Sequence, residues 1–381
     1  MSNRKRIAFI LRSVFPYRTT FYEKLNSHQE YEWLFFHGIK EKEDGRPAYQ
    51  GKLNFPNQPL QNLDGKIGPF AIRWQVYLFQ ILRKWRPDVI IMLGFPSMIN
   101  HWLIMYWARR RNIKIIVWYC GWESQAGNSF NLHVKGRILQ KYMHLADHII
   151  TYSTKAKSYL KDLEVQSNKM VVGYNGLEID HLLANEKEYL EKGKALRDQY
   201  QQNGKKIFLY VGGMIAEKQV PLLLNAFRAI NASENAVLWL VGDGPDLDML
   251  KNMADGMNLK GVKFWGRVIE GVDVFFAAAD YFVLPGVGGL SLNQALFWRL
   301  PCIVSEADGT EDDLVLDGKT GFRFTPMDLQ SLEKALSRCL ELPETTRLDF
   351  GNTGRRLVLE RSNVNQMVNT FLRTIEQDAV S

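Results

Sequence analysis

A run of four apolar residues, Tyr281–Leu284, reads YFVL and contains no charged side chain. A strand of this composition must be covered on both faces, as strands in parallel sheets are. The run ends at Pro285, a glycine-rich turn follows, and apolar residues with helical spacing begin at Leu290. A buried strand that leads through a tight turn into a helix predicts an α/β fold.

The same alternation of strand and helix runs along the whole chain. Apolar, β-forming runs predict further strands at residues 7–11, 33–36, 89–93, 115–119, 148–152, 170–173, 207–211, 236–241, 262–265 and 303–305. In the first half, the segments between the strands have the apolar spacing or the composition of helices. They are residues 20–25, 70–85, 99–111, 134–145 and 155–160. This rhythm indicates parallel sheets with helical connections.

The length of the chain, 381 residues, exceeds the usual size of one hydrophobic core. Residues 181–206 are rich in Lys, Glu and Gln, which indicates a solvated helix and a linker. We therefore predict one α/β domain over residues 1–180, the linker over 181–206, a second α/β domain over 207–361 and an amphipathic tail over 362–381. Two such domains in tandem leave a cleft, which is a common place for small-molecule sites.

Positive charge is concentrated in the first half. Residues 1–180 carry a net charge of +12, whereas residues 181–381 carry −5. A basic half suits anionic lipid, a phosphate-bearing acceptor or nucleic acid. Nucleic acid is the least favoured of the three, because no nucleic-acid recognition motif accompanies the charge.

Two aromatic segments of the first half bear on membrane contact. Residues 73–86 combine aromatic and cationic side chains, which fits either an interfacial membrane helix or a buried helix with a charged end. Residues 101–108 are apolar for about two turns only, too short for a span of about 20 residues. We expect no membrane crossing here, and contact with a membrane surface and simple core packing both stay open.

The cellular compartment is indicated by cysteine usage and by the N-terminus. The three cysteines, Cys120, Cys302 and Cys339, are far apart and lack the spacing of a metal site, which fits a reducing compartment. The opening MSNRKRIAFIL passes from charge directly into a short apolar run, without the features of a secretory signal. We predict a cytoplasmic protein, with a peripheral place at the inner face of the cytoplasmic membrane as an extension of that prediction.

Several predicted strands end in glycine. The segments FLYVGGMIAEK (208–218), LWLVGDGP (238–245) and VKFWGRV (262–268) join the glycine turn after Pro285 and the segment DGKTGF (317–322). Carboxyl ends of parallel strands meet at one edge of a sheet, so these glycines predict one pocket. The helix that starts at Gly288, Gly289 and Leu290 can hold an anion on its first backbone N–H groups. Such a turn also occurs where glycine only permits close packing.

The order and spacing of these segments resemble the family 4 retaining glycosyltransferases of GT-B fold, over nearly the whole chain. In the first half, residues 86–90, 146–153 and 175–176 match landmarks of that family, and residues 15–22 resemble its bacterial surface-polysaccharide group. The resemblance implies two Rossmann-like domains that face a cleft, with the tail over 362–381 returning to the first domain.

The resemblance also implies a donor site in the second domain. Lys218 matches a lysine that holds the donor diphosphate, where fixed positive charge stabilises the leaving phosphate in the transition state. Without the family pattern, Lys218 would be interpreted as a solvated loop lysine. The other positions expected to bind the donor are Gly212, Gly213, Arg267, Val268, Gly288, Gly289, Leu290 and Gln294.

The sequence departs from the family pattern at three charged positions. The usual arginine near the lysine falls on Gly213, and the paired glutamates fall on Gly286 and Gln294. Gln294 can still donate and accept hydrogen bonds, but Gly286 cannot replace a side-chain contact. These losses also fit a catalytically weak glycosyltransferase-like protein that binds a partner or a glycan.

Expected acceptor-side residues lie in the first domain. Arg12, Tyr17 and Arg18 follow the first predicted strand, and Trp122 lies in the segment WYCGWE, near the position of a histidine in many family members. The arginines would alternatively pair with nearby acids. Glu123 is the nearest carboxylate and a candidate catalytic residue, with an ordinary loop charge as the alternative.

No cofactor and no metal site are expected. The pair Asp246 and Asp248 follows Gly244-Pro245 at a predicted helix start, where acidic side chains stabilise the helix dipole. The resemblance implies a metal-independent enzyme that moves a sugar from a nucleotide-sugar donor to a saccharide acceptor, one joined to lipid diphosphate if the basic half binds it. A nucleotide-sugar epimerase is a further, less favoured alternative, because no clear acid–base set is found.

Overall fold

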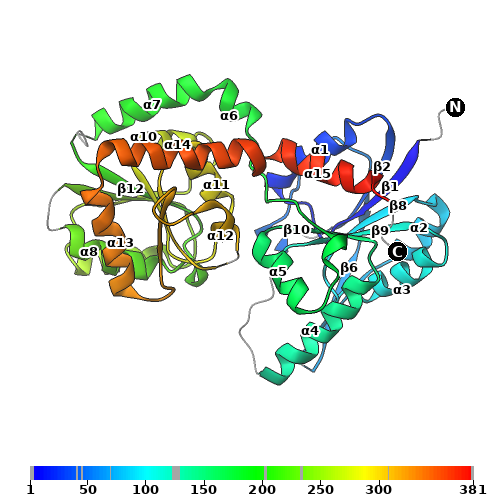
Figure 1. Cartoon of the computed structure of the whole chain (residues 1–381). Helices are drawn as coiled ribbons and strands as arrows, with labels where there is room; N and C mark the ends of the chain where they lie inside the picture. Colours follow the sequence, from blue (N-terminus) through cyan, green and yellow to red (C-terminus); the bar gives the residue numbers. More distant parts are fainter. Residues whose placement is uncertain are drawn as a thin grey trace. The chain divides into compact units, whose positions relative to one another are not determined.

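The computed structural model describes residues 4–39, 42–43, 46–68, 70–121, 129–200, 204–231, 235–307 and 309–378. The chain divides into two compact units, one formed by Met1–Tyr174 with Val364–Ser381 and the other by Asn175–Asn363. Each unit contains a parallel sheet with helices packed on it (Figure 1). The predicted α/β class with two parallel-sheet domains is confirmed.

The first unit is built on a seven-stranded sheet in the order β11-β10-β9-β8-β1-β2-β5, and every neighbouring pair is parallel. The strands are β1 (Lys5–Ile10), β2 (Tyr31–Gly38), β5 (Asn57–Leu60), β8 (Val89–Leu93), β9 (Lys114–Tyr119), β10 (His148–Thr151) and β11 (Met170–Val172). The helices are α1 (Thr19–Asn26), α2 (Leu78–Trp85), α3 (Ile99–Arg109), α4 (Ser129–His144), α5 (Thr154–Asp162) and α15 (Val364–Glu376).

The C-terminal helix α15 completes the core of this first unit. Its Phe371 is fully buried, and the ring lies 5.8 Å from Phe9 and 5.3 Å from Trp118, measured between ring centroids. At the far end of the helix, the Glu376 carboxylate pairs with Lys5 at 2.9 Å. The last helix of the chain is therefore an integral part of the unit that the first strand begins.

The structure corrects one predicted element of the first unit. Residues 70–85 were expected to be helical, but Phe70–Gln75 forms strand β7, which pairs antiparallel with β6 (Asn62–Ile67). Only Leu78–Trp85 is helical. Alternate residues of β7 are apolar, and β6 lies close by in sequence, so strand pairing wins over helical composition.

The second unit is built on a six-stranded parallel sheet in the order β14-β13-β12-β15-β16-β17. The strands are β12 (Lys206–Val211), β13 (Ala236–Val241), β14 (Val262–Gly266), β15 (Tyr281–Leu284), β16 (Cys302–Ser305) and β17 (Gly321–Phe324). Its helices are α6 (Asp180–Ala184), α7 (Glu186–Gln199), α8 (Val220–Asn231), α9 (Leu247–Gly256), α10 (Asp273–Ala278), α11 (Leu290–Phe297), α12 (Thr310–Leu314), α13 (Leu329–Glu341) and α14 (Glu344–Arg361). As expected from its composition, Tyr281–Leu284 is buried at every position.

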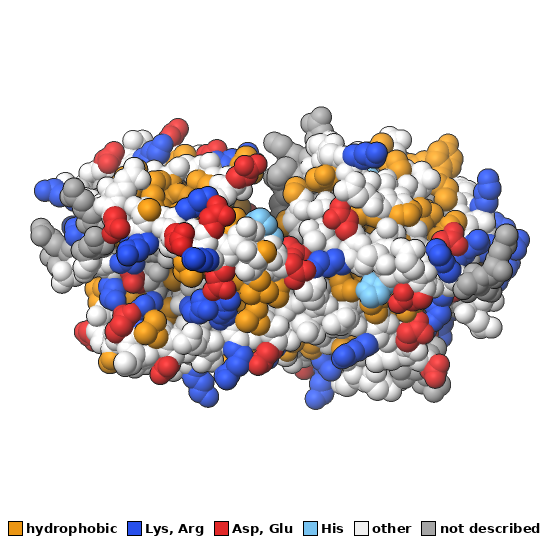
Figure 2. All heavy atoms as spheres, turned by 90° about the horizontal axis from the view of Figure 1, so that it is seen from above, with side chains coloured by type: hydrophobic (Ala, Val, Ile, Leu, Met, Phe, Trp, Pro, Cys, Tyr) orange, Lys and Arg blue, Asp and Glu red, His pale blue; other side chains and the backbone are white. Residues whose placement is uncertain are grey.

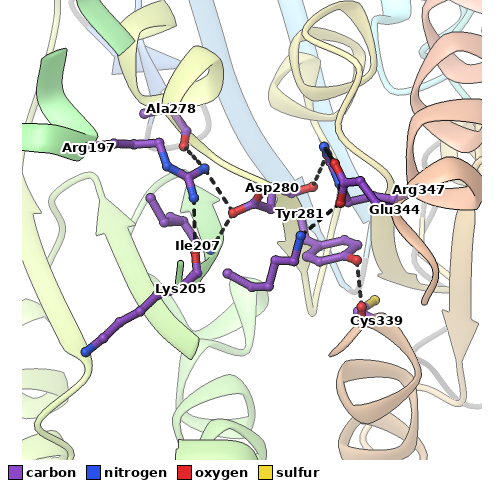
Figure 3. A network of polar contacts seen from close by, with 10 residues as sticks. Arg197, Lys205, Ile207, Ala278, Asp280, Tyr281, Cys339, Glu344 and Arg347 are labelled. Atoms are coloured by element: carbon purple, nitrogen blue, oxygen red, sulfur yellow. Dashed lines mark hydrogen bonds and ion pairs between the residues drawn. The ribbon is translucent and has the colours of Figure 1, made fainter. Parts of the chain in front are cut away.

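The segment expected as a linker belongs to the second unit. Residues 181–206 include α7, whose Gly193 lies directly against α10, because a Cβ there would be 2.9 Å from the Ala277 Cβ. Arg197 of α7 donates to the buried Asp280 carboxylate at 3.0 Å, and the backbone N–H of Ile207 donates to the same carboxylate at 2.8 Å (Figure 3). These contacts fasten α7 to the amino ends of β12 and β15, so it packs as part of the unit.

The surface shown in Figure 2 carries charges of both signs. Basic and acidic side chains are intermingled on this face, among apolar and neutral side chains. The net positive charge of residues 1–180 therefore does not form one continuous basic patch on the face shown. No described helix combines the length and hydropathy that crossing a bilayer requires.

Candidate functional site

The strand order of the second unit places its candidate site. Counted along the chain from β12, the six strands lie in the order 3-2-1-4-5-6, which reverses between β12 and β15. In open parallel sheets, ligands bind outside the carboxyl ends of the strands at such a reversal. Two segments lie there, residues 212–219 after β12 and residues 285–289 after β15.

Lys218 joins these two segments. Its Nζ donates to the carbonyl of Val287 at 2.6 Å and to the carbonyl of Gly288 at 2.7 Å. In the opposite direction, the N–H of Val287 donates to the Glu217 carbonyl at 3.0 Å. Helix α11 begins at Leu290, immediately after this turn, so an ammonium group and the positive end of a helix dipole lie together. The arrangement suits an anionic group.

The glycines around Lys218 let the two backbones approach closely. A Cβ on Gly286 would lie 2.2 Å from the Glu217 carbonyl oxygen and 2.9 Å from the Lys218 Cα. A Cβ on Gly242 or on Gly244, in the neighbouring loop, would come within 1.8 Å and 2.3 Å of the carbonyl oxygens of Gly212 and Met214. No side chain fits at these positions, so the backbone contact requires glycine at 286, the position where the resemblance predicts a glutamate.

Gly213 is different, because it has space beside it. A Cβ there would have no neighbour nearer than 3.9 Å, and Tyr210 Oη donates to the Gly213 carbonyl at 2.8 Å. Packing therefore leaves room for a side chain at 213, the position where the resemblance predicts an arginine.

The Gln294 side chain is held by a carboxylate that the sequence did not single out. Its Nε2 donates to Asp273 Oδ1 at 2.6 Å, and the indole N–H of Trp298 donates to the same oxygen at 2.8 Å. Asp273 lies at the start of α10 and is only 8% exposed. The sequence analysis predicted no helix at residue 273, and nothing in the sequence links Asp273 to Gln294.

The remaining donor-side positions lie in the loop after β14. Arg267 is exposed and Val268 is half-buried, directly after Gly266, which has a positive φ of 69°. This loop follows the carboxyl end of an outer strand of the same sheet, two strands away from β12. The structure thus brings the predicted donor positions to one edge of the sheet.

The first unit has its own reversal of strand order, between β1 and β8. At the carboxyl end of β1, the Leu11 carbonyl accepts from Gln75 Nε2 and the Arg12 carbonyl accepts from Asn62 Nδ2, both at 2.9 Å. Asn100 Nδ2 donates in turn to the Gln75 carbonyl at 2.9 Å. Within the described part of the chain, the side-chain oxygens of these three amides have no hydrogen-bond partner. None of these three amides was predicted from the sequence; they belong to the hairpin β6–β7 and to α3.

The predicted acceptor-side residues differ in exposure, although the Arg18 Cζ lies 5.3 Å from the centroid of the Tyr17 ring. Arg12 and Arg18 are buried, at 9% and 3% exposure, whereas Tyr17 is 46% exposed. The Arg18 guanidinium donates to Tyr152 Oη at 2.6 Å, and its Cζ lies 5.3 Å from the centroid of the Trp118 ring. In this structure Arg18 therefore packs within the core of the first unit instead of presenting its charge to a ligand.

Two predicted residues, Trp122 and Glu123, lie outside the described residues. The pair Asp246 and Asp248 lies at the start of α9, and the Asp248 side chain is 94% exposed, in agreement with the structural interpretation. Among the described residues, no group of three or more His, Cys, Asp or Glu side chains could hold a metal ion.

Comparison with known proteins matches both halves of the chain to glycosyltransferase families. Residues 40–181 match the model for Glycosyltransferase Family 4, and residues 192–357 match the model for Glycosyl transferases group 1. The chain carries the paired domains of a GT-B glycosyltransferase.

Individual relatives of this GT-B chain are distant. It is 22% identical over 261 residues to an uncharacterized glycosyltransferase of Methanocaldococcus jannaschii, a match that covers 67% of the chain and 64% of the relative, less than two thirds of the relative's length. The structure of HepE from Anabaena in complex with UDP superimposes with a TM-score of 0.75 at 15% identity, over 97% of this chain and 99% of that one. WaaG, described as a glycosyltransferase involved in lipopolysaccharide biosynthesis, gives 0.67 at 14% identity, over 98% and 100%. These similarities establish the fold.

Proposed function

We propose that this protein transfers a sugar from a nucleoside-diphosphate sugar to a saccharide acceptor, with retention of configuration. The observation that carries the proposal is Lys218, whose ammonium group lies at the start of α11 and at the reversal of strand order. The bond between the anomeric carbon and the diphosphate oxygen breaks, and a bond from that carbon to an acceptor hydroxyl oxygen forms. The hydroxyl proton passes to the departing diphosphate oxygen. Lys218 and the first N–H groups of α11 stabilise the charge that develops on the leaving diphosphate.

The donor in this proposal is a nucleotide sugar bound by the second unit, without a metal ion. The UDP bound to the similar HepE structure supports a uridine nucleotide as the first choice. Gln294 and Asp273 lie one helical turn into α11 and at the start of α10, where a polar pair can meet ribose hydroxyl groups. Arg267 and Val268 would line the same edge.

The acceptor in this proposal is a saccharide bound by the first unit and carried on a lipid. The net charge of +12 in residues 1–180 suits a lipid diphosphate. The role of the similar protein WaaG in lipopolysaccharide biosynthesis supports a cell-surface glycan as the product, and a peripheral place at the cytoplasmic membrane as the location. Tyr17, Trp122 and Glu123 stay as candidates for the acceptor side, with Glu123 as the candidate catalytic carboxylate.

A second candidate function is supported by the absence of charged side chains at three positions of the candidate donor site. Glycine occupies 213 and 286, and glutamine occupies 294, so the site holds fewer charges than the family pattern. A protein that binds a nucleotide or a glycan without efficient transfer is compatible with this set.

Thermal unfolding with UDP, GDP and their sugars tests the proposal. A ligand at about 100 times its Kd stabilises the folded state by about 2.7 kcal/mol, so selective stabilisation identifies the nucleotide. We expect Lys218→Ala to abolish this stabilisation. The matched control is Lys319→Ala, because Lys319 is exposed and precedes β17, at the opposite edge of the sheet. Stabilisation without measurable sugar transfer would favour the binding protein, and no stabilisation by any nucleotide would contradict the donor site.

A further inference from the structure

The hairpin β6–β7 stands outside the seven-stranded sheet of the first unit and has two unlike faces. Residues directly opposite each other in an antiparallel pair lie on the same face. One face carries the pairs Leu63–Trp74, Gly65–Ile72 and Ile67–Phe70, and the other carries Asn62–Gln75, Asp64–Arg73 and Lys66–Ala71. The hairpin is therefore apolar on one face and polar on the other.

The polar face is the one that holds the hairpin to its unit. Asn62 and Gln75 donate to the carbonyls that end β1, and Arg73 Nη1 donates to Ser97 Oγ at 3.0 Å. Asp64, Lys66 and Ala71 of the polar face are exposed as well, so the outer part of the hairpin projects into solvent. Its apolar face therefore leaves large side chains uncovered. An exposed apolar patch of this kind marks an interaction surface.

Three exposed side chains on this face define the surface that we call the hairpin surface. They are Leu63, Ile67 and Trp74, exposed by 50%, 69% and 37%. Tyr77 lies two residues beyond the end of β7, at a positive φ of 64°, and is 67% exposed. Trp74 and Tyr77 are of the aromatic types that favour the interface between water and lipid.

The neighbouring helix α3 also exposes apolar side chains at regular spacing. Ile99, Leu103 and Tyr106 are exposed by 40%, 50% and 48%, and they recur at intervals of four and three along one helix face. The Arg73 N–H donates to the Ser97 carbonyl at 2.8 Å, so the hairpin borders the start of this helix. Arginines at positions 109, 110 and 111 follow at the other end of the helix.

Charge identifies the partner of this region. Residues 61–113 contain eight basic and two acidic residues, a net charge of +6. Apolar and aromatic side chains combined with this excess match a bilayer that contains anionic lipid, where the apolar groups enter the headgroup region and the cations meet phosphates. We propose that the hairpin surface, with α3 beside it, docks this protein on an anionic lipid bilayer. The lipid-linked acceptor of the proposed function gives this docking a purpose, but docking itself requires no sugar transfer.

Co-sedimentation of the full-length protein with vesicles tests the proposal. The vesicles contain phosphatidylcholine alone or phosphatidylcholine with phosphatidylglycerol, and only the second kind is expected to bind the wild type. The variant Leu63→Ser/Ile67→Ser is expected to bind at least about tenfold more weakly, because it removes two apolar side chains from the contact. The control is Leu348→Ser/Met327→Ser, two second-unit residues that are exposed by 47% and 67%, almost the same as Leu63 and Ile67.

Each other outcome overturns the proposal. Equal binding to both vesicle types would show that anionic lipid is not required. Equal loss of binding in the test and control variants would show that the hairpin surface is not the contact. Sedimentation analysis without vesicles gives the third outcome: if the hairpin variant turns an oligomer into a monomer and leaves vesicle binding unchanged, the surface contacts a second copy of the chain. Stabilisation by a nucleotide, measured on the same samples, reports folding and the donor site independently, so failure of either proposal can be recognised separately.

Discussion

At Gly286, one hydrogen in place of a side chain decides whether the two loops of the candidate donor site can meet. The Glu217 carbonyl oxygen would lie 2.2 Å from a Cβ at this position. The contact at Gly286 joins backbone atoms of both loops. Backbone cannot move aside as a flexible side chain can. We therefore regard residue 286 as a packing position that also shapes the turn in front of α11.

The contrast with Gly213 provides a paired prediction. Gly286→Ala is expected to destabilise the protein by about 1–3 kcal/mol and to weaken nucleotide-dependent stabilisation, because the loop that holds Lys218 must shift. Gly213→Ala is expected to change stability by less than about 1 kcal/mol, since its Cβ would have no neighbour within 3.9 Å. Urea unfolding with and without UDP measures both effects. Equal destabilisation by the two variants would contradict the packing account.

A buried histidine of α3 predicts a pH dependence of stability. His101 is 2% exposed, its Nδ1 lies 3.3 Å from Tyr142 Oη, and burial lowers the pKa of His101 from 6.5 to about 3. Between these two values the unfolded chain binds a proton that the folded chain does not. Stability is therefore complete above the unfolded pKa and falls by about 1.4 kcal/mol for each pH unit below it.

Replacing His101 tests this linkage. His101→Phe is expected to recover about 2 kcal/mol of the stability that the wild type loses between about pH 6.5 and pH 5. Urea unfolding across that range measures the difference in slope. The half-buried His28 supplies a matched control, because His28→Phe shows the general effect of the same substitution outside α3. A wild-type slope that persists in His101→Phe would assign the pH dependence to other groups.

At the scale of elements, the hairpin shows how pairing partners override local composition. Residues 70–85 contain enough Leu, Arg and Lys for a helix, yet only Leu78–Trp85 becomes one. Phe70–Gln75 instead meets β6, and its alternate residues Phe70, Ile72 and Trp74 form one face with Leu63 and Ile67. A strand of period two inside a longer, mixed segment is hard to recognise without its partner strand.

The Asp280 network links elements at the amino ends of β12 and β15 and predicts a large effect for a single change (Figure 3). Asp280 accepts from Arg197 and from the Ile207 N–H, and its side chain is 9% exposed. Asp280→Ala leaves the half-buried Arg197 guanidinium without its carboxylate, so we expect a loss of about 3–5 kcal/mol. The control is Glu188→Ala, which removes the partner of Lys192 in an exposed pair of α7 and should change stability far less, because solvent screens such a pair. Chemical denaturation compares the two, and similar small losses would contradict the network.

At the scale of the whole molecule, each of the two units has its own hydrophobic core. We therefore expect two unfolding transitions, each of which responds to changes in its own unit. Calorimetry is expected to show that nucleotide raises only the transition of the unit formed by Asn175–Asn363. Phe371→Ala should lower the free energy of unfolding of the first unit by about 3–5 kcal/mol, because α15 completes the core of that unit. Phe350→Ala, in α14, should lower the transition that nucleotide raises. Loss of nucleotide-dependent stabilisation in Phe371→Ala would show that the two units do not respond separately.

Much of the fold could be predicted because the local pattern of apolar residues indicates which segments are buried. Tyr281–Leu284 has no polar residue, so its place inside a parallel sheet follows from composition alone. The glycines after β12 and β15 likewise marked the edge of the sheet where Lys218 lies. The division of the chain was less visible, because residues 181–206 have a solvated composition and still pack through Gly193 and Arg197.

Three features depended on neighbours that are distant in sequence. Arg18 is enclosed by Trp118, Tyr152 and α15, and Asp273 meets Gln294. The hairpin is held to the end of β1 by Asn62 and Gln75 of its polar face, and it leaves Leu63, Ile67 and Trp74 exposed. The sequence by itself determined which segments form buried strands and where their glycine turns lie, since these properties depend on residues a few positions apart. Only the tertiary structure decided which side chains meet and which apolar surface is left uncovered, because those outcomes depend on contacts between segments that the local pattern does not encode.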